Sequence, residues 1–140
     1  MTIFLSKSEK DTQEFAKGLA SSLKAGNVIA FEGGLGAGKT AFTRGLAEGL
    51  GCTDSVSSPT FSIVNEYDGK IPLFHFDMYR IETLGELYSI GFFEYLERGG
   101  ICAIEWSENI YSALPDDAIF VNIERTSENE RTITVTEGKE

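Results

Sequence analysis

Residues 33–40 read Gly-Gly-Leu-Gly-Ala-Gly-Lys-Thr, which is a complete G-x-x-x-x-G-K-[ST] phosphate-binding loop. Glycines let the backbone wrap so that successive N–H groups point at phosphate oxygens. Lys39 is then placed to contact the β- and γ-phosphates, and the hydroxyl of Thr40 is placed to ligate Mg²⁺. The motif therefore predicts a site for a nucleoside triphosphate with Mg²⁺. The expected nucleotide-binding residues are Gly33, Gly34, Leu35, Gly36, Ala37, Gly38, Lys39, Thr40 and the adjoining Ala41.

The flanks of this loop have the patterns that the motif needs. Residues 28–31 (Val-Ile-Ala-Phe) form a short apolar run of strand length before it. Residues 40–50 after it show helical spacing of apolar side chains, and Gly51 follows as a stop signal. A helix that begins at the loop directs the positive end of its dipole at the same anion.

Hydrolysis or transfer needs, besides the loop and Lys39, an acid at Mg²⁺ or at the attacking nucleophile. Two acids follow strand-like apolar runs: Glu105 after residues 101–104, and Asp77 after residues 73–76. In open α/β sheets the ligand crevice lies at the carboxyl ends of the strands, where either acid could point. We interpret both as catalytic and Glu105 also as a metal ligand with Thr40. The alternative is that each is a surface acid at a strand edge.

Four further residues are candidates for the site or its surroundings. Thr60 follows Pro59 in a loop that should cross above the phosphates, where a hydroxyl can sense the γ-phosphate. Arg80 either supplies a cation to the γ-phosphate or pairs with an acid. Trp106, beside the second acid, either stacks on a ligand or partner or belongs to the core. His75, the only histidine, is interpreted as structural because it lies among aromatic residues.

The remaining pattern predicts an α/β fold, a single P-loop NTPase domain over residues 1–140. Its mixed β-sheet carries an inserted antiparallel hairpin and is flanked by helices. A capping box at Ser8 begins a helix that is expected to run to about Ala25, with Gly26 as its C-cap. Further expected elements are an irregular loop at 52–60, strands at 61–67 and 71–79 around an Asp68-Gly69 turn, helical or irregular structure at 83–97, a buried strand at 101–106, a short helix at 107–114, and strands at 119–124 and 131–136.

The charge is negative and uneven. The formal net charge is −10, of which residues 1–80 contribute −1 and residues 81–140 contribute −9. Such a chain lacks the basic footprint that binds phosphate backbones, so tight direct binding of tRNA or DNA is not expected. The acidic half is either a solvated surface or a face for a basic partner or metal. No apolar run has the length of a membrane span and no signal peptide is evident, so we expect a cytoplasmic protein in which Cys52 and Cys102 are free thiols, the latter in a buried strand.

Taken together, these segments resemble one family: TsaE (formerly YjeE), the ATPase of bacterial tRNA threonylcarbamoyladenosine synthesis. The resemblance covers nearly the whole chain. It rests on the phosphate loop running into Phe-Thr-Arg-Gly at 42–45, Ser-Pro-Thr-Phe at 58–61, His-Phe-Asp-Met-Tyr-Arg at 75–80 and Ile-Glu-Trp-Ser-Glu at 104–108. The family usually has Asp as the second loop residue, where this chain has Gly34. Phosphate binding should survive that difference, because the position is variable in the generic motif.

The resemblance implies that the nucleotide is ATP with Mg²⁺, that Thr40 and Glu105 lie near the metal, and that Asp77 is needed for hydrolysis. It places Thr12 and Arg131 near the adenine. It also implies that the protein works with TsaD, which transfers the threonylcarbamoyl group to tRNA, and with TsaB. ATP binding and hydrolysis would then reset that machinery between turnovers, and tRNA would be contacted only indirectly through the complex.

Two other functions fit the residues. One is a small-molecule P-loop kinase in which Asp77 is the base for a substrate hydroxyl and Arg80 holds that substrate. The other is a nucleotide-gated interaction module that binds ATP without hydrolysing it. ATP turnover without an acceptor separates the first from an ATPase, and assays with and without partners separate the second.

Overall fold

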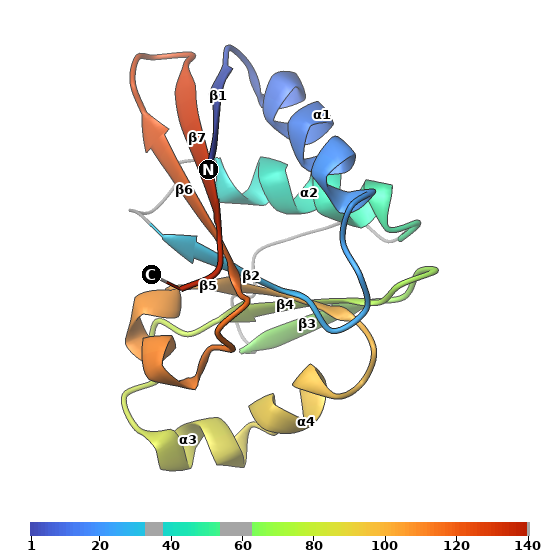
Figure 1. Ribbon diagram of the computed structural model, residues 1–140, viewed down its shortest axis with the longest axis vertical. Coiled ribbons are helices and arrows are strands. Elements are labelled where there is room, and N and C mark those ends of the chain that lie inside the picture. The colour runs from blue at the N-terminus through green and yellow to red at the C-terminus, as the bar shows by residue number, and fades with distance from the viewer. Residues whose placement is uncertain (33–37, 54–62, 140) are drawn as a thin grey trace.

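A seven-stranded mixed sheet organises the computed structural model, which describes residues 1–32, 38–53 and 63–139 (Figure 1). Its strand order is β1-β7-β6-β2-β5-β4-β3. The strands are β1 (Thr2–Ser6), β2 (Val28–Glu32), β3 (Val64–Tyr67), β4 (Leu73–Asp77), β5 (Ile101–Glu105), β6 (Ile119–Arg125) and β7 (Arg131–Glu137). The helices are α1 (Glu9–Ala20), α2 (Lys39–Gly49), α3 (Leu84–Ser89), α4 (Phe92–Leu96) and the 3₁₀ helix η1 (Ser107–Ala113). The predicted α/β fold with its inserted β3–β4 hairpin and flanking helices is confirmed.

The four central strands are parallel and determine where a site can form. β2 pairs with β5 and with β6, and β4 pairs with β5, all in parallel. Their carboxyl ends therefore meet at one edge of the sheet, which is where open α/β sheets bind ligands. β2 and β5 are buried on both faces, as the apolar runs at 28–31 and 101–104 predicted.

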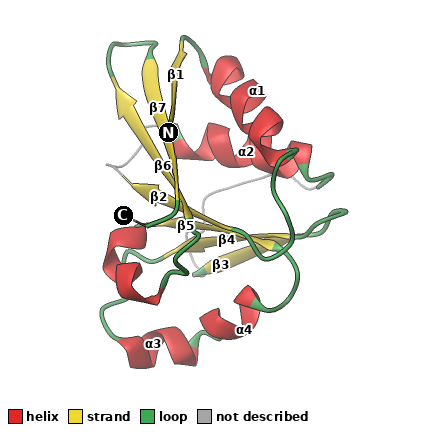
Figure 2. Cartoon of the chain, viewed as in Figure 1, coloured by secondary structure: helices red, strands yellow, loops and turns green. Residues whose placement is uncertain are grey.

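Each face of the sheet has its own core, because side chains alternate along every strand. Helices α1 and α2 cover one face, and α3, α4 and η1 cover the other (Figure 2). Ile29 and Phe31 of β2 pack under α2 with Phe42 and Leu46, whereas Val28 belongs to the second cluster. The second cluster is largely aromatic where β4 meets α4. There the ring of Phe76 lies edge-on to the ring of Phe92.

Two glycines bring α1 and α2 unusually close together. A Cβ atom on Gly45 would lie 2.2 Å from the carbonyl oxygen of Gln13, and one on Gly49 would lie 2.6 Å from Cβ of Ala20. No side chain fits at such distances, so the small residues let the helix backbones touch. This contact fixes α2, the helix that begins at Lys39, against the rest of the fold.

The first helix ends earlier than the sequence predicted. α1 stops at Ala20, not near Ala25, because the hydroxyls of Ser21 and Ser22 bond back to the carbonyls of the last turn. Gly26 has φ +95° but serves a different turn, and its N–H donates to the Gly100 carbonyl at 2.8 Å. Gly26 is therefore a turn residue, and its prediction as the C-cap of the first helix is wrong.

Other differences are local. β1 was not predicted; it is an edge strand that forms by antiparallel pairing with β7. The segment 83–97 contains two short helices separated by Gly91, which has φ +76°. The short helix expected at 107–114 is the 3₁₀ helix η1, with non-helical angles at Ile110. β4 is shorter than the predicted 71–79, and Trp106 lies beyond the end of β5.

A surface cluster joins the β3–β4 hairpin to α4. The guanidinium of Arg98 donates to Glu66 at 2.8 Å, and the hydroxyl of Tyr95 donates to the other oxygen of that carboxylate at 2.8 Å. These two donors, the arginine first, hold the pKa of Glu66 below its usual range. The guanidinium also lies 4.7 Å from the centre of the Phe74 ring. The cluster thus fastens α4 to the outer hairpin.

Both cysteines are free, as expected, and Cys102 is buried in β5. Burial raises the pKa of the Cys102 thiol to about 12, which keeps it protonated and unreactive. Among the described helices, none is both long and apolar enough to cross a membrane.

Candidate functional site

The phosphate motif lies between β2 and α2, the context that it requires. Gly33, Gly34, Leu35, Gly36 and Ala37 fall outside the described residues. The end of the motif is described: Gly38 has φ +99°, a conformation that glycine adopts readily, and it is the N-cap of α2. Lys39, Thr40 and Ala41 form the first turn of that helix. Its first N–H groups therefore face the position where the motif predicts phosphate.

Lys39 is almost fully buried, with 4% of its surface exposed. Its ammonium lies 5.7 Å from the centre of the Trp106 ring, which is within the range of a cation–π contact. The Thr43 hydroxyl donates to the Lys39 carbonyl at 2.8 Å, one turn along the helix. A buried lysine at a helix N-terminus places positive charge beside positive dipole ends, which suits an anionic ligand.

Asp77 and Glu105 are direct neighbours across the parallel strands β4 and β5. Both occupy the last positions of their strands, at the same edge at which β2 ends before the phosphate motif. Glu105 is on β5, the strand next to β2. The two acids predicted from separate segments of the sequence are thus brought side by side.

The two carboxylates have different local partners. Oδ1 of Asp77 accepts a hydrogen bond from the Tyr79 N–H at 3.0 Å, which forms a tight turn after β4. Oε2 of Glu105 lies 2.6 Å from Nε2 of His75, and 14% of the Glu105 side chain is exposed. Each acid therefore has one oxygen held by the protein.

His75 is fully buried, as its interpretation as a structural residue implies, and its side chain also contacts Glu105. It lies two residues before Asp77 on β4, so period-2 alternation puts both on one sheet face. Its Cα partner on β5 is Ala103, and Glu105 lies two residues further along that strand, within diagonal reach. The spacing of His75 and Asp77 in one run and Glu105 in another was a usable signal, but it required the pairing of β4 with β5.

Trp106 adopts a left-handed conformation, with φ 58° and ψ 40°. Such a backbone costs a non-glycine residue about 1–3 kcal/mol and clusters at functional sites. The turn aims the indole at Tyr79, with 4.9 Å between ring centres, and at Lys39. It also lets the buried Ser107 hydroxyl donate to the Phe31 carbonyl at 2.8 Å, which ties the end of β5 to the end of β2.

A hollow of about 590 Å³ opens beside this tryptophan. It is lined by Tyr79, Arg80, Ile81, Glu82, Trp106 and Asn109. The Tyr79 side chain is largely exposed, and Asn109 holds the turn by donating to the Met78 and Tyr79 carbonyls. Arg80 thus lines the same hollow as Trp106, whose ring contacts Lys39.

Arg131 lies beside the start of α2, and Thr12 contacts Ser6, the residue that pairs with Arg131. Cγ of Arg131 is 4.0 Å from the position that a Cβ atom on Gly38 would occupy, and Arg131 pairs with Ser6 across β7 and β1. The Ser6 hydroxyl donates to the Ser8 carbonyl at 2.8 Å, so the Thr12 hydroxyl, 2.7 Å away, donates to Ser6. Only the lone pairs of the Thr12 oxygen remain for a ligand, and the Arg131 guanidinium donates to carbonyls of the β6–β7 turn.

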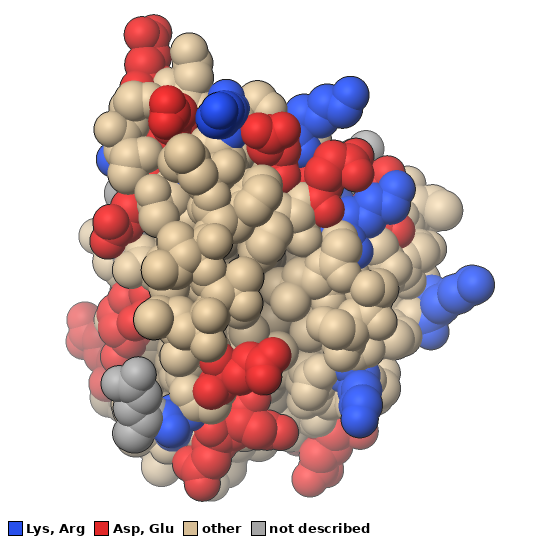
Figure 3. Space-filling model, turned by 45° about the horizontal axis from the view of Figure 1, so that its top comes forward, with Lys and Arg blue, Asp and Glu red and all other residues tan. Residues whose placement is uncertain are grey.

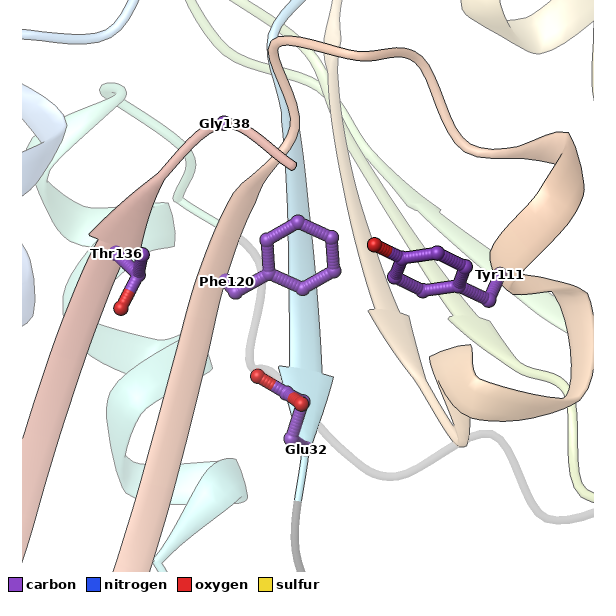
Figure 4. A pocket seen from close by; sticks show the side chains of 5 residues that line it. All are labelled: Glu32, Tyr111, Phe120, Thr136 and Gly138. Carbon is purple, nitrogen blue, oxygen red and sulfur yellow. The ribbon is translucent and has the colours of Figure 1, made fainter. Parts of the chain in front are cut away.

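Thr60, like the first five residues of the phosphate motif, lies outside the described residues. A second hollow of about 210 Å³ lies beside β2 (Figure 4), where Glu32, Tyr111 and Phe120 point toward one another. Among the described residues that line it, Glu32 has the one charged side chain. We assign it no chemistry.

The metal expected with the nucleotide is compatible with the side chains present. Mg²⁺ prefers oxygen ligands, and proteins usually supply one or two carboxylates while phosphates and water supply the rest. Thr40 offers a hydroxyl and Glu105 a carboxylate, so the donor set fits. No group of three or more His, Cys, Asp or Glu side chains suited to a metal occurs in the described ranges.

The surface is predominantly acidic, as the composition of 22 acids and 12 bases requires. On the face shown in Figure 3, acidic side chains lie along the upper edge, the left side and the lower part, around a broad uncharged area. Lysine and arginine side chains on this face are dispersed along its margins, so this face has no continuous basic patch.

Comparisons with known proteins point to one family. The family described as "Threonylcarbamoyl adenosine biosynthesis protein TsaE" matches residues 6–133. A protein of Bacillus subtilis named "tRNA threonylcarbamoyladenosine biosynthesis protein TsaE" is 46% identical over 128 residues, covering 91% of this chain and 80% of the relative. The protein of the same name from Treponema pallidum is 37% identical, covering 94% of this chain and 97% of the relative.

A solved structure agrees with these sequence matches. The crystal structure of Bacillus subtilis YdiB superposes with a TM-score of 0.79 at 38% sequence identity, over 99% of this chain and 86% of that one. The match includes both the phosphate-loop half and the acidic half of the chain. Together with the arrangement of the strand ends and α2, these comparisons establish that the chain belongs to the TsaE family.

Proposed function

We propose that this protein binds ATP with Mg²⁺ at residues 33–41 and hydrolyses it in support of tRNA threonylcarbamoyladenosine synthesis. The observation that carries the proposal is the meeting of Asp77 and Glu105 at the sheet edge where β2 leads into the phosphate motif. A phosphate loop alone binds nucleotide, but a pair of acids beside it has the composition of a phosphoryl-transfer site.

In this proposal, the residues at the start of α2 bind the phosphates of ATP. The buried ammonium of Lys39 contacts the β- and γ-phosphates, and the N–H groups of the first turn donate to them. Burial makes this cation effective, because fewer water molecules compete with the phosphate. Ala41 contributes a backbone N–H and a side chain small enough to be buried in the first turn. Arg131, which lies beside Gly38, and Thr12, which contacts Ser6 on the strand paired with Arg131, are proposed to border the adenine.

Turnover follows from the two carboxylates. Thr40 and Glu105 would hold Mg²⁺, which when bound neutralises charge that develops on the phosphate oxygens. Asp77 is one strand further from β2 and has an oxygen not used by the Tyr79 N–H. We assign it to orient the attacking water, while the loop amides and Lys39 hold the γ-phosphate in line. Thr60 is proposed to approach the γ-phosphate from the loop predicted at residues 52–60.

The partners proposed are TsaD and TsaB, in the cytoplasm, with tRNA bound by the complex and not by this chain alone. The hollow beside Trp106 supports this, because its lining includes the exposed Tyr79 side chain and Trp106, whose ring contacts Lys39. Occupation of the site by ATP would move Lys39 and the stacked indole, and Arg80 and Tyr79 would carry that change to the partner surface.

The test is nucleotide binding by calorimetry and phosphate release with and without a TsaD–TsaB complex. Lys39→Ala should abolish tight ATP binding, because it removes the buried cation. Lys24→Ala, which removes an exposed lysine from the turn after α1, is the matched control and should bind as the parent does. Equal ATP affinity of the Lys39→Ala variant and the parent would refute the binding site.

Partner-dependent hydrolysis is expected, with association strongest in the ATP state. Phosphate transfer to a small acceptor with no hydrolysis in its absence would instead identify a kinase. ATP-dependent association without any turnover would identify a gated binding module.

A further inference from the structure

His75 is fully buried, with 0% of its side chain exposed, and within the described residues the one hydrogen bond of its side chain is to Glu105. The contact crosses two strands: His75 is on β4, its Cα partner on β5 is Ala103, and Glu105 reaches back from two residues further along. The methyl side chain of Ala103 between them leaves room for the imidazole and carboxylate to meet at 2.6 Å.

The direction of this hydrogen bond follows from the chemistry of the two groups. A carboxylate oxygen can only accept, so Nε2 of His75 carries the proton and donates it to Oε2 of Glu105. The other ring nitrogen, Nδ1, is buried and has no partner in the described part of the chain. The imidazole is therefore committed to a single interaction.

This arrangement is a poor one for stability. A buried polar atom without a partner destabilises the fold, and an apolar side chain of similar size would avoid that loss. Glu105 in turn lies at a strand end with 14% of its side chain exposed, where water could solvate it without the histidine. The contact is therefore better explained by a function than by stability.

The consequence for Glu105 is a fixed carboxylate. A glutamate side chain has three rotatable bonds and adopts several rotamers when it is free. The hydrogen bond from His75 holds Oε2 on the inner side, and within the described residues no hydrogen bond uses Oε1. A carboxylate with one oxygen anchored and one available is ready to bind a metal or water without first losing rotamer freedom.

We propose that His75 is the positioning residue of Glu105, and that its Nε2–H holds this carboxylate in the orientation that the Mg²⁺–nucleotide site uses. The inference rests on the proposed function, which assigns Glu105 to the metal. It concerns the donor on His75 and not the charge of the ring.

The first experiment compares two substitutions of His75. His75→Met removes the donor and fills the space with an apolar side chain, whereas His75→Gln keeps an N–H donor at the position of Nε2. We expect His75→Met to lower kcat for ATP about 10–100-fold, the usual effect of losing a residue that orients a metal ligand. The ATP dissociation constant should change less than about 3-fold, because Lys39 and the loop amides are intact.

His75→Gln should recover most of the lost rate. A Gln variant as slow as the Met variant would overturn the proposal, because the donor would then not be what matters. Stability provides a further criterion: urea unfolding of His75→Met should occur at the parental midpoint or above it. A marked fall in that midpoint would assign His75 to the core and overturn the proposal as well.

A readout without nucleotide separates this inference from the proposed function. His75 is the only histidine in the chain, so the imidazole ¹H–¹⁵N signals of the parent need no assignment. We expect them to report a proton on Nε2 in a strong hydrogen bond, and Glu105→Ala should shift that signal upfield. An Nδ1–H tautomer, or a signal indifferent to Glu105→Ala, would refute the positioning role whether or not the protein hydrolyses ATP.

If instead the signal responds to Glu105→Ala but the parent never hydrolyses ATP with partners, the proposed function fails and the contact between the two residues stands. These two failures are therefore distinguishable.

Discussion

Replacing Gly45 with alanine should destabilise the protein, although alanine is the better helix former. A Cβ atom at this position would lie 2.2 Å from the Gln13 carbonyl oxygen and 2.8 Å from Cβ of Ala16. Ordinary contacts of this kind begin near 3.4 Å, so α1 and α2 must separate by more than an ångström. The atom in the way is backbone, which cannot rotate aside as a flexible side chain could.

The magnitude follows from two opposing terms. Alanine gains about 1 kcal/mol over glycine in a helix interior. Overpacking a well-packed contact costs about 1–3 kcal/mol, and a rigid backbone neighbour places Gly45→Ala at the upper end. We therefore expect a net loss of about 1–2 kcal/mol from these two terms.

Gly18→Ala is the matched control. Gly18 also lies in a helix, α1, but a Cβ atom there would meet nothing within 4 Å. It should gain about 0.5–1 kcal/mol, because only the propensity term remains. Urea denaturation followed by far-UV circular dichroism measures both variants. A Gly45→Ala protein as stable as Gly18→Ala would show that α1 and α2 do not approach as closely as described.

Three further outcomes are expected. Asp77→Asn and Glu105→Gln should each keep the ATP affinity, measured by calorimetry, within about 3-fold of that of the parent. The rate of phosphate release should fall by at least about 100-fold in each, and parental turnover in both variants would mean that the roles are misassigned. Glu66→Gln should lower stability by about 0.2–1 kcal/mol at neutral pH, because the ion pair with its arginine partner is largely exposed. Since the folded-state pKa of Glu66 is lowered, this contribution is present above the ordinary carboxyl pKa and is lost as pH falls through the lowered value, so parent and variant should converge in acid denaturation curves. Alkylation of the folded protein at pH 8 should modify Cys52 and leave Cys102 unmodified by mass spectrometry, because burial raises the pKa of the Cys102 thiol to about 12.

The sequence by itself determined those features that depend on local spacing. The glycines and Lys39 of the phosphate motif, the apolar runs of β2 and β5, and the acids that end strands are all readable in single segments, because steric freedom, burial and strand alternation act over a few residues. The turn at residues 68–69 likewise predicted the inserted hairpin. These patterns sufficed for the fold class and for most of the candidate site.

Tertiary structure decided what depends on contacts between distant segments. β1 is a strand only because β7 offers it an edge, and α1 ends at Ala20 because serine hydroxyls compete for its last carbonyls. The left-handed turn that brings Trp106 to Lys39 has no signature in the chain. Above all, His75 lies 30 residues from Glu105. Their hydrogen bond depends on the register in which β4 pairs with β5, and no single segment of the sequence contains that register.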